Sequence, residues 1–485
     1  MNRYEMICPL DARFGRDEAV AEKVRPYLSE EASLRFLLKV EVALVTALAR
    51  KGLCAGRVAE EVREAARKIT PDQVFQEEAR TKHPVMAIVN CLKRLVSGEA
   101  RPYVHFMATS ADIVCSADAC RYKAFTELVL LPRLMDLERT LIILARTEKN
   151  TLQIGRTHGQ HAEPITFGFQ IAQYVSRMGG RILKIAHASR ELRGKFAGAV
   201  GSYNSMALFL EDPEEFEREV LAELGLSPSP ISTQIVEAEF LVDYVHSLIS
   251  AFGILANIAD DMRHLQRTEI GEVEELFGEE QVGSSTMPQK RNPIVFETVK
   301  SLWKVSMPMI VTAYSDQISE HQRDLTNRES QRFVAEIVAS LYVAADKVAS
   351  SLKTLSVRHD RMEENLQRSI DMICGEPAHL LLSAQGFAEA HEVVRRLTIT
   401  AKKEGRGLRE LLFEEPQLAP YLKALSERQR EILEDPRNYS GISARKTDRI
   451  CEQWEGEINR LAVVLAEIQD RQRAQDDRQA LSIGM

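Results

Sequence analysis

The sequence predicts an all-α protein built around a bundle of long helices. Only 24 Gly and 17 Pro interrupt its 485 residues, fewer than the usual share of these two helix-breaking residues. Charged residues, most of them good helix formers, make up 28% of the chain. Apolar residues also recur at spacings of three and four over 240–267, which is typical of one buried face of a long helix.

That apolar stripe is the clearest periodic feature of the chain. We expect further long helices over 120–149, 167–193, 297–317 and 330–355, and shorter ones over 30–51 and 55–69. Helices of about 40 Å, at 1.5 Å per residue, make a bundle too long for one small domain, and such helices often associate across subunits. The stripe consists of Leu241, Val245, Leu248, Phe252, Leu255, Ile258, Met262 and Leu265.

The positions of Gly and Pro, together with the apolar periodicity, divide the chain into three predicted domains. The first is an N-terminal helical domain over 1–109, and the second is the long-helix domain over 110–357. The third is a C-terminal helical domain over 358–485, whose last residues, 470–480, have almost no apolar side chains. We expect that tail to fray.

Composition excludes several classes of protein. The net charge is −8 and no Lys- or Arg-rich run occurs, so nothing indicates a nucleic-acid-binding surface; a few local cations still suffice for a small anion. None of the seven Cys forms a C-x-x-C pair, which argues against structural zinc and a disulfide framework. We find no signal peptide and no run near the ~20 apolar residues of a membrane span. A cytoplasmic protein is expected.

Residues 283–293 are the strongest candidate for a reactive segment. Its Gly, two Ser and two Pro do not continue a helix, so the segment should be a loop between long helices. A hydroxyl pair, the ammonium of Lys290 and the carboxamide of Asn292 lie close together in it, with Glu297 just beyond. Such a loop can close over an anion, and a nearby cation lowers the pKa of a hydroxyl. The alternative is a polar surface loop.

A second segment, 155–164, contains His158 and His161 between two predicted helices. Histidine titrates in the range that general acid–base catalysis requires. A zinc site is a weak alternative, because H-x-x-H here lacks a Cys or Glu at the usual spacing. Structural histidines are the remaining alternative.

Two further segments carry potential anion-binding groups. In 103–112, Thr109 and Ser110 can cap the following helix, and a helix N-terminus with two hydroxyls can also bind a carboxylate or phosphate. In 322–332, three arginines could clamp such a group. Simple capping and solvated arginines are the respective alternatives.

Together these segments resemble a known superfamily. Residues 283–292 resemble the signature loop G-S-S-x-M-P-x-K-x-N of the fumarase/aspartase superfamily at every fixed position. Within it the chain resembles the adenylosuccinate lyase family most closely, in order along the sequence. The matching segments are 8–15 (S-P-L-x-x-R-Y in the family), 81–85 (T-x-H-D-V), 155–164 (G-R-T-H-G-x-H-A-E-P), 198–201 (G-A-V-G), 232–234 and 323–325.

The resemblance implies a fumarase/aspartase-like three-domain fold whose central long-helix bundle tetramerises. It also implies β-elimination of fumarate from adenylosuccinate to give AMP, and the same elimination from the succinylated aminoimidazole carboxamide ribotide. The active sites would each be built by three subunits and would need no cofactor or metal. Ser284 would be the base, with Ser285 as its rival, and His158 the acid, oriented by Glu297; Lys290 would favour the serine alkoxide. The substrate-binding residues implied are Arg13, His83, His105, Thr109, Ser110, Asp112, Thr157, Gln234, Met287, Asn292, Arg323 and Arg332.

Three departures from the family pattern bear on the substrate. Phe14 replaces a tyrosine and Pro84 an aspartate, while Arg328 and Glu329 replace small hydroxyl residues. They leave open another N-succinyl or nitrosuccinate lyase. A carboxymuconate cycloisomerase is a further alternative, although that group usually lacks a histidine at the position of His158. Argininosuccinate lyases lack the Arg13 segment, and a non-catalytic structural homologue would not need these residues intact.

Overall fold

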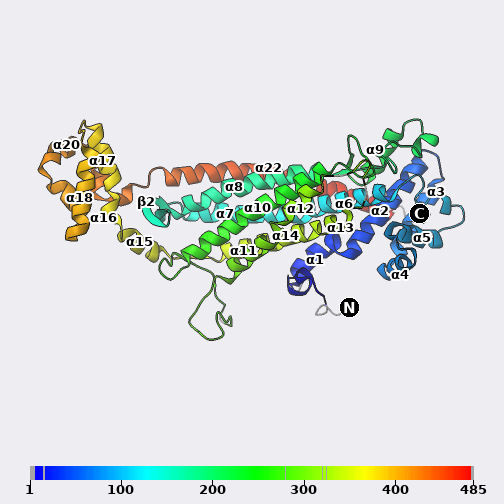
Figure 1. The fold of residues 1–485 in the computed structure, drawn as a ribbon, viewed down its shortest axis with the longest axis horizontal. Helices are drawn as coiled ribbons and strands as arrows, with labels where there is room; N and C mark the ends of the chain where they lie inside the picture. The colour runs from blue at the N-terminus through cyan, green and yellow to red at the C-terminus, as the bar shows by residue number, and fades with distance from the viewer. Residues whose placement is uncertain (1–5, 15–16, 279, 319, 324, 482–485) are drawn as a thin grey trace.

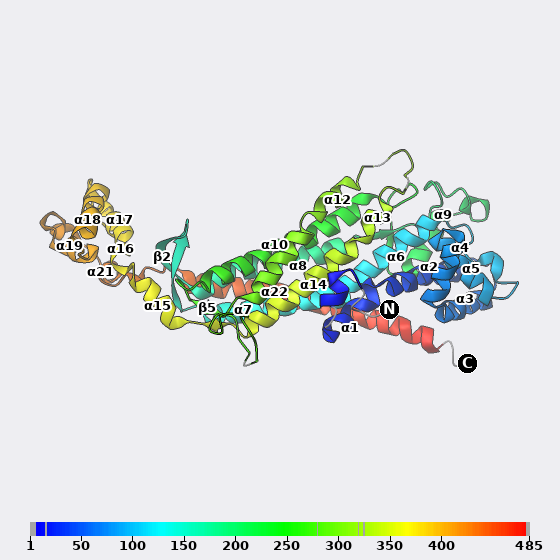
Figure 2. The same cartoon turned by 60° about the horizontal axis from the view of Figure 1, so that its bottom comes forward.

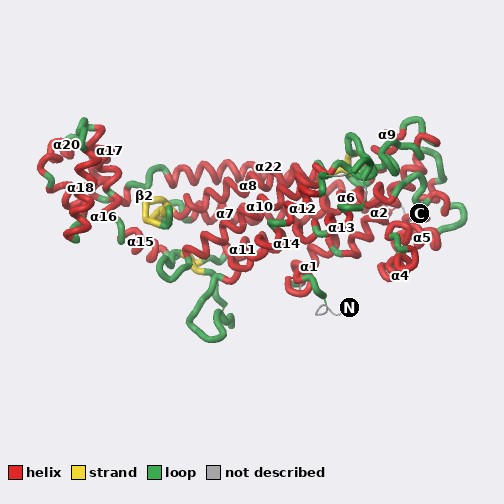
Figure 3. Tube along the Cα trace, in the orientation of Figure 1, coloured by secondary structure: helices red, strands yellow, loops and turns green. Residues whose placement is uncertain are grey.

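The computed structural model describes residues 6–14, 17–278, 280–318, 320–323 and 325–481, with only the backbone at position 12 and over 472–481. The protein is elongated and almost entirely helical, with a small group of helices at each end of a long bundle (Figure 1). The all-α prediction is therefore confirmed. Figure 3 shows how little of the chain is strand.

The N-terminal helices lie at one end of the bundle. Pro follows the cap of both α4 and α5, where its missing N–H is tolerated, and Thr70 with Gln73 forms a capping box at α4. These elements are η2 (Leu10–Phe14), α1 (Glu18–Leu28), α2 (Glu30–Arg50), α3 (Gly56–Lys68), α4 (Pro71–Thr81), α5 (Pro84–Leu95) and η3 (Arg101–Tyr103).

The central bundle contains the long helices that the periodicity predicted. A break at Met307 and Pro308 divides the expected helix over 297–317 in two, because Pro removes a helical hydrogen bond. The bundle comprises α6 (Ser110–Phe125), the π-helical turn η4 (Thr126–Leu130), α7 (Leu131–Thr147), α8 (Phe167–Arg190), α10 (Ala238–Leu265), α11 (Ile294–Ser306), α12 (Met309–Ser315), α13 (Arg328–Arg332) and α14 (Val334–Lys353).

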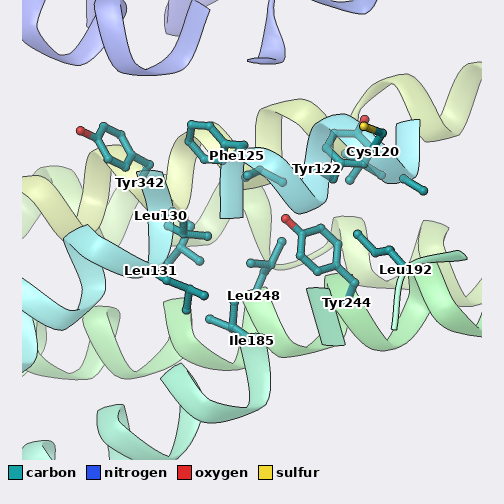
Figure 4. Packing of buried hydrophobic residues seen from close by; sticks show 14 of the residues in the cluster. Cys120, Tyr122, Phe125, Leu130, Leu131, Ile185, Leu192, Tyr244, Leu248 and Tyr342 are labelled. Carbon is teal, nitrogen blue, oxygen red and sulfur yellow. The ribbon is translucent and has the colours of Figure 1, made fainter. Parts of the chain in front are cut away.

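Aromatic and branched side chains fill the interior of this bundle. Tyr122, Phe125, Leu131, Ile185 and Leu248 come from four different helices and have at most 1% exposure (Figure 4). The hydroxyls of Tyr244 and Thr126 lie 2.7 Å apart inside the core, so the polar end of this buried ring is hydrogen-bonded.

Helix α10 differs from the sequence-based expectation that no run of apolar residues is long enough to span a membrane. By length and composition it qualifies, with a mean hydropathy of 1.5 over its most apolar window. Other parts of the protein bury 61% of that window, and every residue of the predicted stripe except Leu241 is buried. The helix is apolar because it lies in the core of the bundle.

The C-terminal helices form a small core of their own beyond the far end of the bundle. Its buried residues lie between Cys374 and Leu433. The elements are α15 (His359–Gln367), α16 (Ile370–Ile373), α17 (Gly375–Ala384), α18 (Ala390–Glu404), α19 (Leu408–Glu414), η6 (Pro416–Leu418), α20 (Ala419–Lys423), α21 (Glu427–Glu434) and η7 (Pro436–Asn438).

The last helix, α22 (Ser443–Leu481), returns along the bundle (Figure 2). Its Cys451, Ile458 and Leu465 belong to the main core, although the sequence had assigned this segment to the C-terminal domain. The helix also continues through 470–480, where we expected fraying, because Arg, Gln and Ala are good helix formers. The three-domain division itself stays a prediction.

Three small two-stranded sheets and two short connecting helices join the long elements. β1 (Leu152–Thr157) and β2 (Gln160–Thr166) form an antiparallel hairpin between α7 and α8. β3 (Arg193–Gly194) pairs in parallel with β4 (Ser227–Pro228), and β5 (Val273–Glu274) pairs in antiparallel fashion with β6 (Ser356–Val357). The helices are η5 (Met206–Leu208) and α9 (Pro213–Glu223).

Candidate active site

The β1–β2 hairpin presents His158 at its tip. His158 and Gly159 are the two residues between the strands and have φ of 54° and 74°, the combination that a two-residue type I′ turn requires. The imidazole is exposed, and no hydrogen bond involving it occurs among the described residues. His161 instead lies 2.7 Å from the Ser369 hydroxyl, in keeping with a structural role.

A cavity of about 950 Å³ opens beside this hairpin. Gly155, Arg156 and His161 line it from the hairpin, and His264 from the end of α10. Burial lowers the pKa of His161, and the neighbouring Arg156 lowers it further. His161 is therefore poorly suited to act as an acid at neutral pH.

The signature segment forms an extended loop before α11, as predicted. Its base is fixed, because the Asn292 amide donates to the Gly283 carbonyl at 2.7 Å. A Cβ at Gly283 would overlap the Lys290 carbonyl, so only glycine fits there. The Glu275 carboxylate accepts the backbone N–H of Phe296 at 2.9 Å and caps α11.

The two serines of this loop differ in their surroundings. The hydroxyl oxygen of Ser284 accepts backbone N–H groups of Met287 at 3.0 Å and Thr286 at 3.3 Å. Such donors favour an ionised oxygen over a neutral one. Ser285 is exposed, and its side chain makes no hydrogen bond within the described chain.

The other catalytic and substrate-binding candidates near the signature loop and the hairpin tip face solvent. Lys290, Met287 and Glu297 are exposed. Among the residues that the structure describes, no hydrogen bond joins Glu297 to His158, so this predicted pairing stays a prediction. Thr157, at the end of β1, is likewise exposed.

A second group of candidate residues lies where α5 and α6 begin. His83 caps α5 by accepting the Met86 N–H on Nδ1 at 3.2 Å, and its Nε2 is 3.4 Å from the Ser110 hydroxyl. Thr109 and Asp112 form a capping box at the start of α6, as the sequence predicted. This hydroxyl pair therefore lies at a helix N-terminus, a geometry that favours anions.

Asp112 occupies a different place from the one expected. Its side chain has no exposed surface and lies 2.5 Å from the Lys195 ammonium, which is equally buried. The carboxylate also accepts the backbone N–H of Ala197 at 3.2 Å and of Thr109 at 2.8 Å. We infer that Asp112 holds Thr109 in place and does not contact substrate.

His105 forms a nearly buried pair with Glu41, their side chains 2.7 Å apart. Burial by itself lowers the pKa of His105, but the hydrogen bond and charge of Glu41 outweigh it and raise that pKa. The ring is 13% exposed, so most of it is closed to a ligand. The loop after α12 contributes Arg323, whose guanidinium donates to the carbonyls of Asp316 and Gln317, both at 3.2 Å.

The remaining candidates also lie toward the α5–α6 end of the bundle or along its side. The backbone N–H of Gln234 donates to the Gln322 carbonyl at 3.2 Å, which ties two predicted segments together. Arg332 pairs with Glu329 at 3.1 Å. Arg13 lines a cavity of about 210 Å³ together with Phe14 and residues of α14.

Backbone strain coincides with the predicted segments. Among the described residues, six that are not glycine have positive φ, a conformation that costs free energy and often marks functional sites. Five lie inside segments selected from the sequence, and Tyr203 lies two residues beyond the 198–201 turn. The six are Lys82, His105, Met107, His158, Tyr203 and Arg323.

The candidates form two groups at opposite ends of the bundle. Helical segments of 16, 5 and 17 residues lead from Ser110 to Thr147, just before the hairpin. At 1.5 Å per residue they extend for roughly 55 Å. Figure 2 shows β2 and the α4–α5 pair far apart along the long axis. One chain therefore does not unite His158 with Thr109 and Ser110.

Two buried residues around these segments were not selected from the sequence. Lys195 supports Asp112, and Glu272 accepts hydrogen bonds from Arg156, two residues before His158. Nothing in the pattern of the sequence marks Glu272. Lys195 lies three residues before the 198–201 turn, which is the one sequence signal that pointed toward it.

Comparison with known proteins agrees with the sequence resemblance. A family model described as Lyase matches residues 15–305, and one described as Adenylosuccinate lyase C-terminal matches 319–430. Adenylosuccinate lyase of Pyrococcus horikoshii is 36% identical over 456 residues, covering 92% of this chain and 98% of that protein.

Solved structures have the same fold. A fumarate lyase from Mesorhizobium sp. BNC1 matches with a TM-score of 0.79 and 26% identity, over 89% of this chain and 97% of its own. The 3-carboxy-cis,cis-muconate lactonizing enzyme of Pseudomonas putida matches with a TM-score of 0.78 and 24% identity, over 92% of this chain and 98% of its own. This second match supports the fold alone. The chain belongs to the adenylosuccinate lyase family and is a lyase that breaks a carbon–nitrogen bond.

Proposed function

We propose that the protein eliminates fumarate from adenylosuccinate to give AMP, as a cytoplasmic enzyme of purine biosynthesis. The single observation that carries this proposal is the 36% identity to an adenylosuccinate lyase over 92% of the chain, with the signature loop complete. The same chemistry suits the succinylated aminoimidazole carboxamide ribotide, which carries the same succinyl group on nitrogen.

The elimination needs a base for a weakly acidic C–H bond. We assign this role to Ser284, whose oxygen already accepts two backbone N–H groups. These donors, with Lys290 when the loop closes, favour the alkoxide. The C–H bond breaks, its electron pair forms the C=C bond of fumarate, and the C–N bond breaks. Hydrogen-bond donors around the adjacent carboxylate stabilise the negative charge that develops there.

The departing nitrogen needs a proton, which we assign to His158. Its ring is exposed at a tight turn, so it can reach a substrate bound outside its own hairpin. A carboxylate that fixes its direction would raise its efficiency, and Glu297 is the candidate. Lys290, Met287 and Asn292 would contact the succinyl group or close the loop over it.

The second group of residues would bind the rest of the substrate. Thr109 and Ser110 at the N-terminus of α6 suit a carboxylate, with His83 at the same end of the bundle and Gln234 as a further ligand. Thr157 would reach this carboxylate on the hairpin of another subunit. Arg13, Arg323 and Arg332 would hold the nucleotide phosphate. Arg328 already pairs with Asp118 at 3.8 Å, so this departure from the family pattern does not add a free cation to the phosphate site.

We propose that the active protein is a homotetramer with shared active sites. The roughly 55 Å between the two groups supports sharing, because each site then takes its groups from different subunits. An apolar surface on α11, α12 and the following loop supports association. It contains Val305, Val311 and Ile318, which are 70%, 64% and 81% exposed in one chain.

The test is to mix the purified protein with adenylosuccinate and measure AMP and fumarate together. Equal amounts of both products, lost in Ser284→Ala and retained in Ser285→Ala, support the reaction and the base. Turnover that survives in Ser284→Ala contradicts the base assignment. A folded wild-type protein without turnover contradicts the substrate, and fumarate release from other succinyl compounds then becomes the assay.

Mixing two inactive variants tests the shared sites. After subunits of His158→Asn and Ser284→Ala have been exchanged, some sites should contain both intact groups and recover activity. No recovery after proven exchange contradicts sharing.

A further inference from the structure

The buried carboxylate of Glu272 has every acceptor position occupied by a donor from another segment. Its Oε1 accepts from Arg156 Nη2 at 2.6 Å and from the Asn365 amide at 2.8 Å. Its Oε2 accepts from the Gln153 amide at 2.8 Å and from Arg156 Nη1 at 3.1 Å. Glu272 has no exposed surface, and Gln153 and Asn365 are at most 2% exposed.

These partners come from the elements that surround the catalytic hairpin. Gln153 and Arg156 lie on β1, and Arg156 precedes His158 by two residues. Asn365 lies on α15 and also donates to the Ile270 carbonyl at 2.9 Å. Glu272 itself comes just before β5, which leads into the signature loop, and its carbonyl accepts the Arg358 N–H at 2.9 Å.

The hairpin needs such an anchor because its strands are irregular. Their register shifts between Ile154 and Arg156, and the turn that follows puts His158 at positive φ, a conformation that persists only when its surroundings fix it. The bidentate pair between Arg156 and Glu272 is charge-assisted, and such pairs are among the strong hydrogen bonds of proteins.

We propose that Glu272 is a positioning residue for catalysis, which sets the place and direction of the His158 imidazole through Arg156. The assignment of His158 as the acid rests on the proposed function. An amide replaces this carboxylate poorly, because the NH₂ of a glutamine at 272 would face an N–H donor of Arg156 whichever way it pointed, and a guanidinium cannot accept a hydrogen bond. Glu272→Gln therefore releases the hairpin while it keeps the size of the side chain.

The matched control is Glu269→Gln. Glu269 lies in the same connection before β5, and its side chain is exposed. Arg156→Met is a second variant, which removes the link from the hairpin side and keeps the test available if Glu272→Gln does not fold. Because both changes break the same contact, the double variant should show an effect smaller than the sum of the two.

Two measurements test the proposal. In Glu272→Gln and Arg156→Met, kcat for fumarate release should fall about a hundredfold, the size expected from misplacing a catalytic group by about 1 Å. KM should change less than about threefold, and Glu269→Gln should behave like the wild type. Hydrogen exchange followed by mass spectrometry should become faster over 152–166 in both variants, with little change in the α7 and α10 peptides.

Exchange in the hairpin does not depend on the substrate, so it separates the two proposals. No turnover by the wild type refutes the proposed function, while the exchange data still decide whether Glu272 anchors the hairpin. Unchanged kcat with unchanged hairpin exchange overturns the positioning role. A general rise in exchange with kcat intact also overturns it, because that result assigns Glu272 to global stability alone.

Discussion

Replacing Lys195 with methionine should destabilise the protein strongly. Methionine keeps the length and apolar stem of lysine but removes the ammonium, which is 2.5 Å from the Asp112 carboxylate and 2.9 Å from the Gly198 carbonyl. Neither side chain of the pair has exposed surface, so water cannot take the place of the ammonium. The Asp112 carboxylate keeps only its two backbone N–H donors.

The free energy of unfolding should fall by about 3–5 kcal/mol, because the substitution leaves one charge of a buried pair without its partner. The equilibrium constant for unfolding should rise by a factor between roughly a hundred and several thousand. Because Asp112 also fixes Thr109, KM should rise in whatever protein remains folded. Urea denaturation followed by circular dichroism measures the first effect and steady-state kinetics the second.

Lys51→Met is the control. Lys51 pairs at the surface with Glu215 and Glu219, at 2.6 and 2.9 Å, where such pairs contribute little. A urea midpoint for Lys195→Met equal to that of Lys51→Met would refute the reasoning, because it would mean that the buried carboxylate does not need the ammonium.

Two further predictions concern the bundle. Gly179→Ala should destabilise the docking of α22, because its Cβ would overlap the Trp454 ring. In Gly180→Ala the same ring is 3.7 Å from the new Cβ, so this variant should gain about 0.5–1 kcal/mol of stability from helix propensity. Thermal unfolding of the two variants compares these effects. Glu138 is buried without a hydrogen bond, and burial raises its pKa well above the usual 4.5. Above pH 4.5 the folded state therefore keeps the Glu138 carboxyl protonated, whereas the unfolded state ionises it. The free energy of unfolding of the wild type then falls by up to about 1.4 kcal/mol per pH unit until the pKa of the folded state is passed. Glu138→Gln should remove this loss, so its advantage in urea denaturation should grow from pH 5 to pH 8; an advantage that does not depend on pH would contradict the explanation.

Local pattern was enough to predict most of the helices. The stripe from Leu241 to Leu265 marked the buried face of α10, because a helix repeats its faces every 3.6 residues. Pro and Gly marked the signature loop for an equally local reason. The β1–β2 hairpin was missed because its strands are short and polar, and the pairing that stabilises them is not a property of either strand alone.

The sequence by itself determined the helical architecture, the family and the segments that carry the chemistry, because periodicity, punctuation and a spaced motif are properties of neighbouring residues. Only the tertiary structure decided how those segments relate in space. It brought Lys195 to Asp112, and Gln153, Arg156 and Asn365 to Glu272, contacts between residues about 80 to 120 positions apart in the chain. It also placed the two groups of candidate residues at opposite ends of the bundle, since α6 and α7 continue as one long helical path. Burial and distance depend on how the whole chain packs, and no short stretch of sequence contains that information.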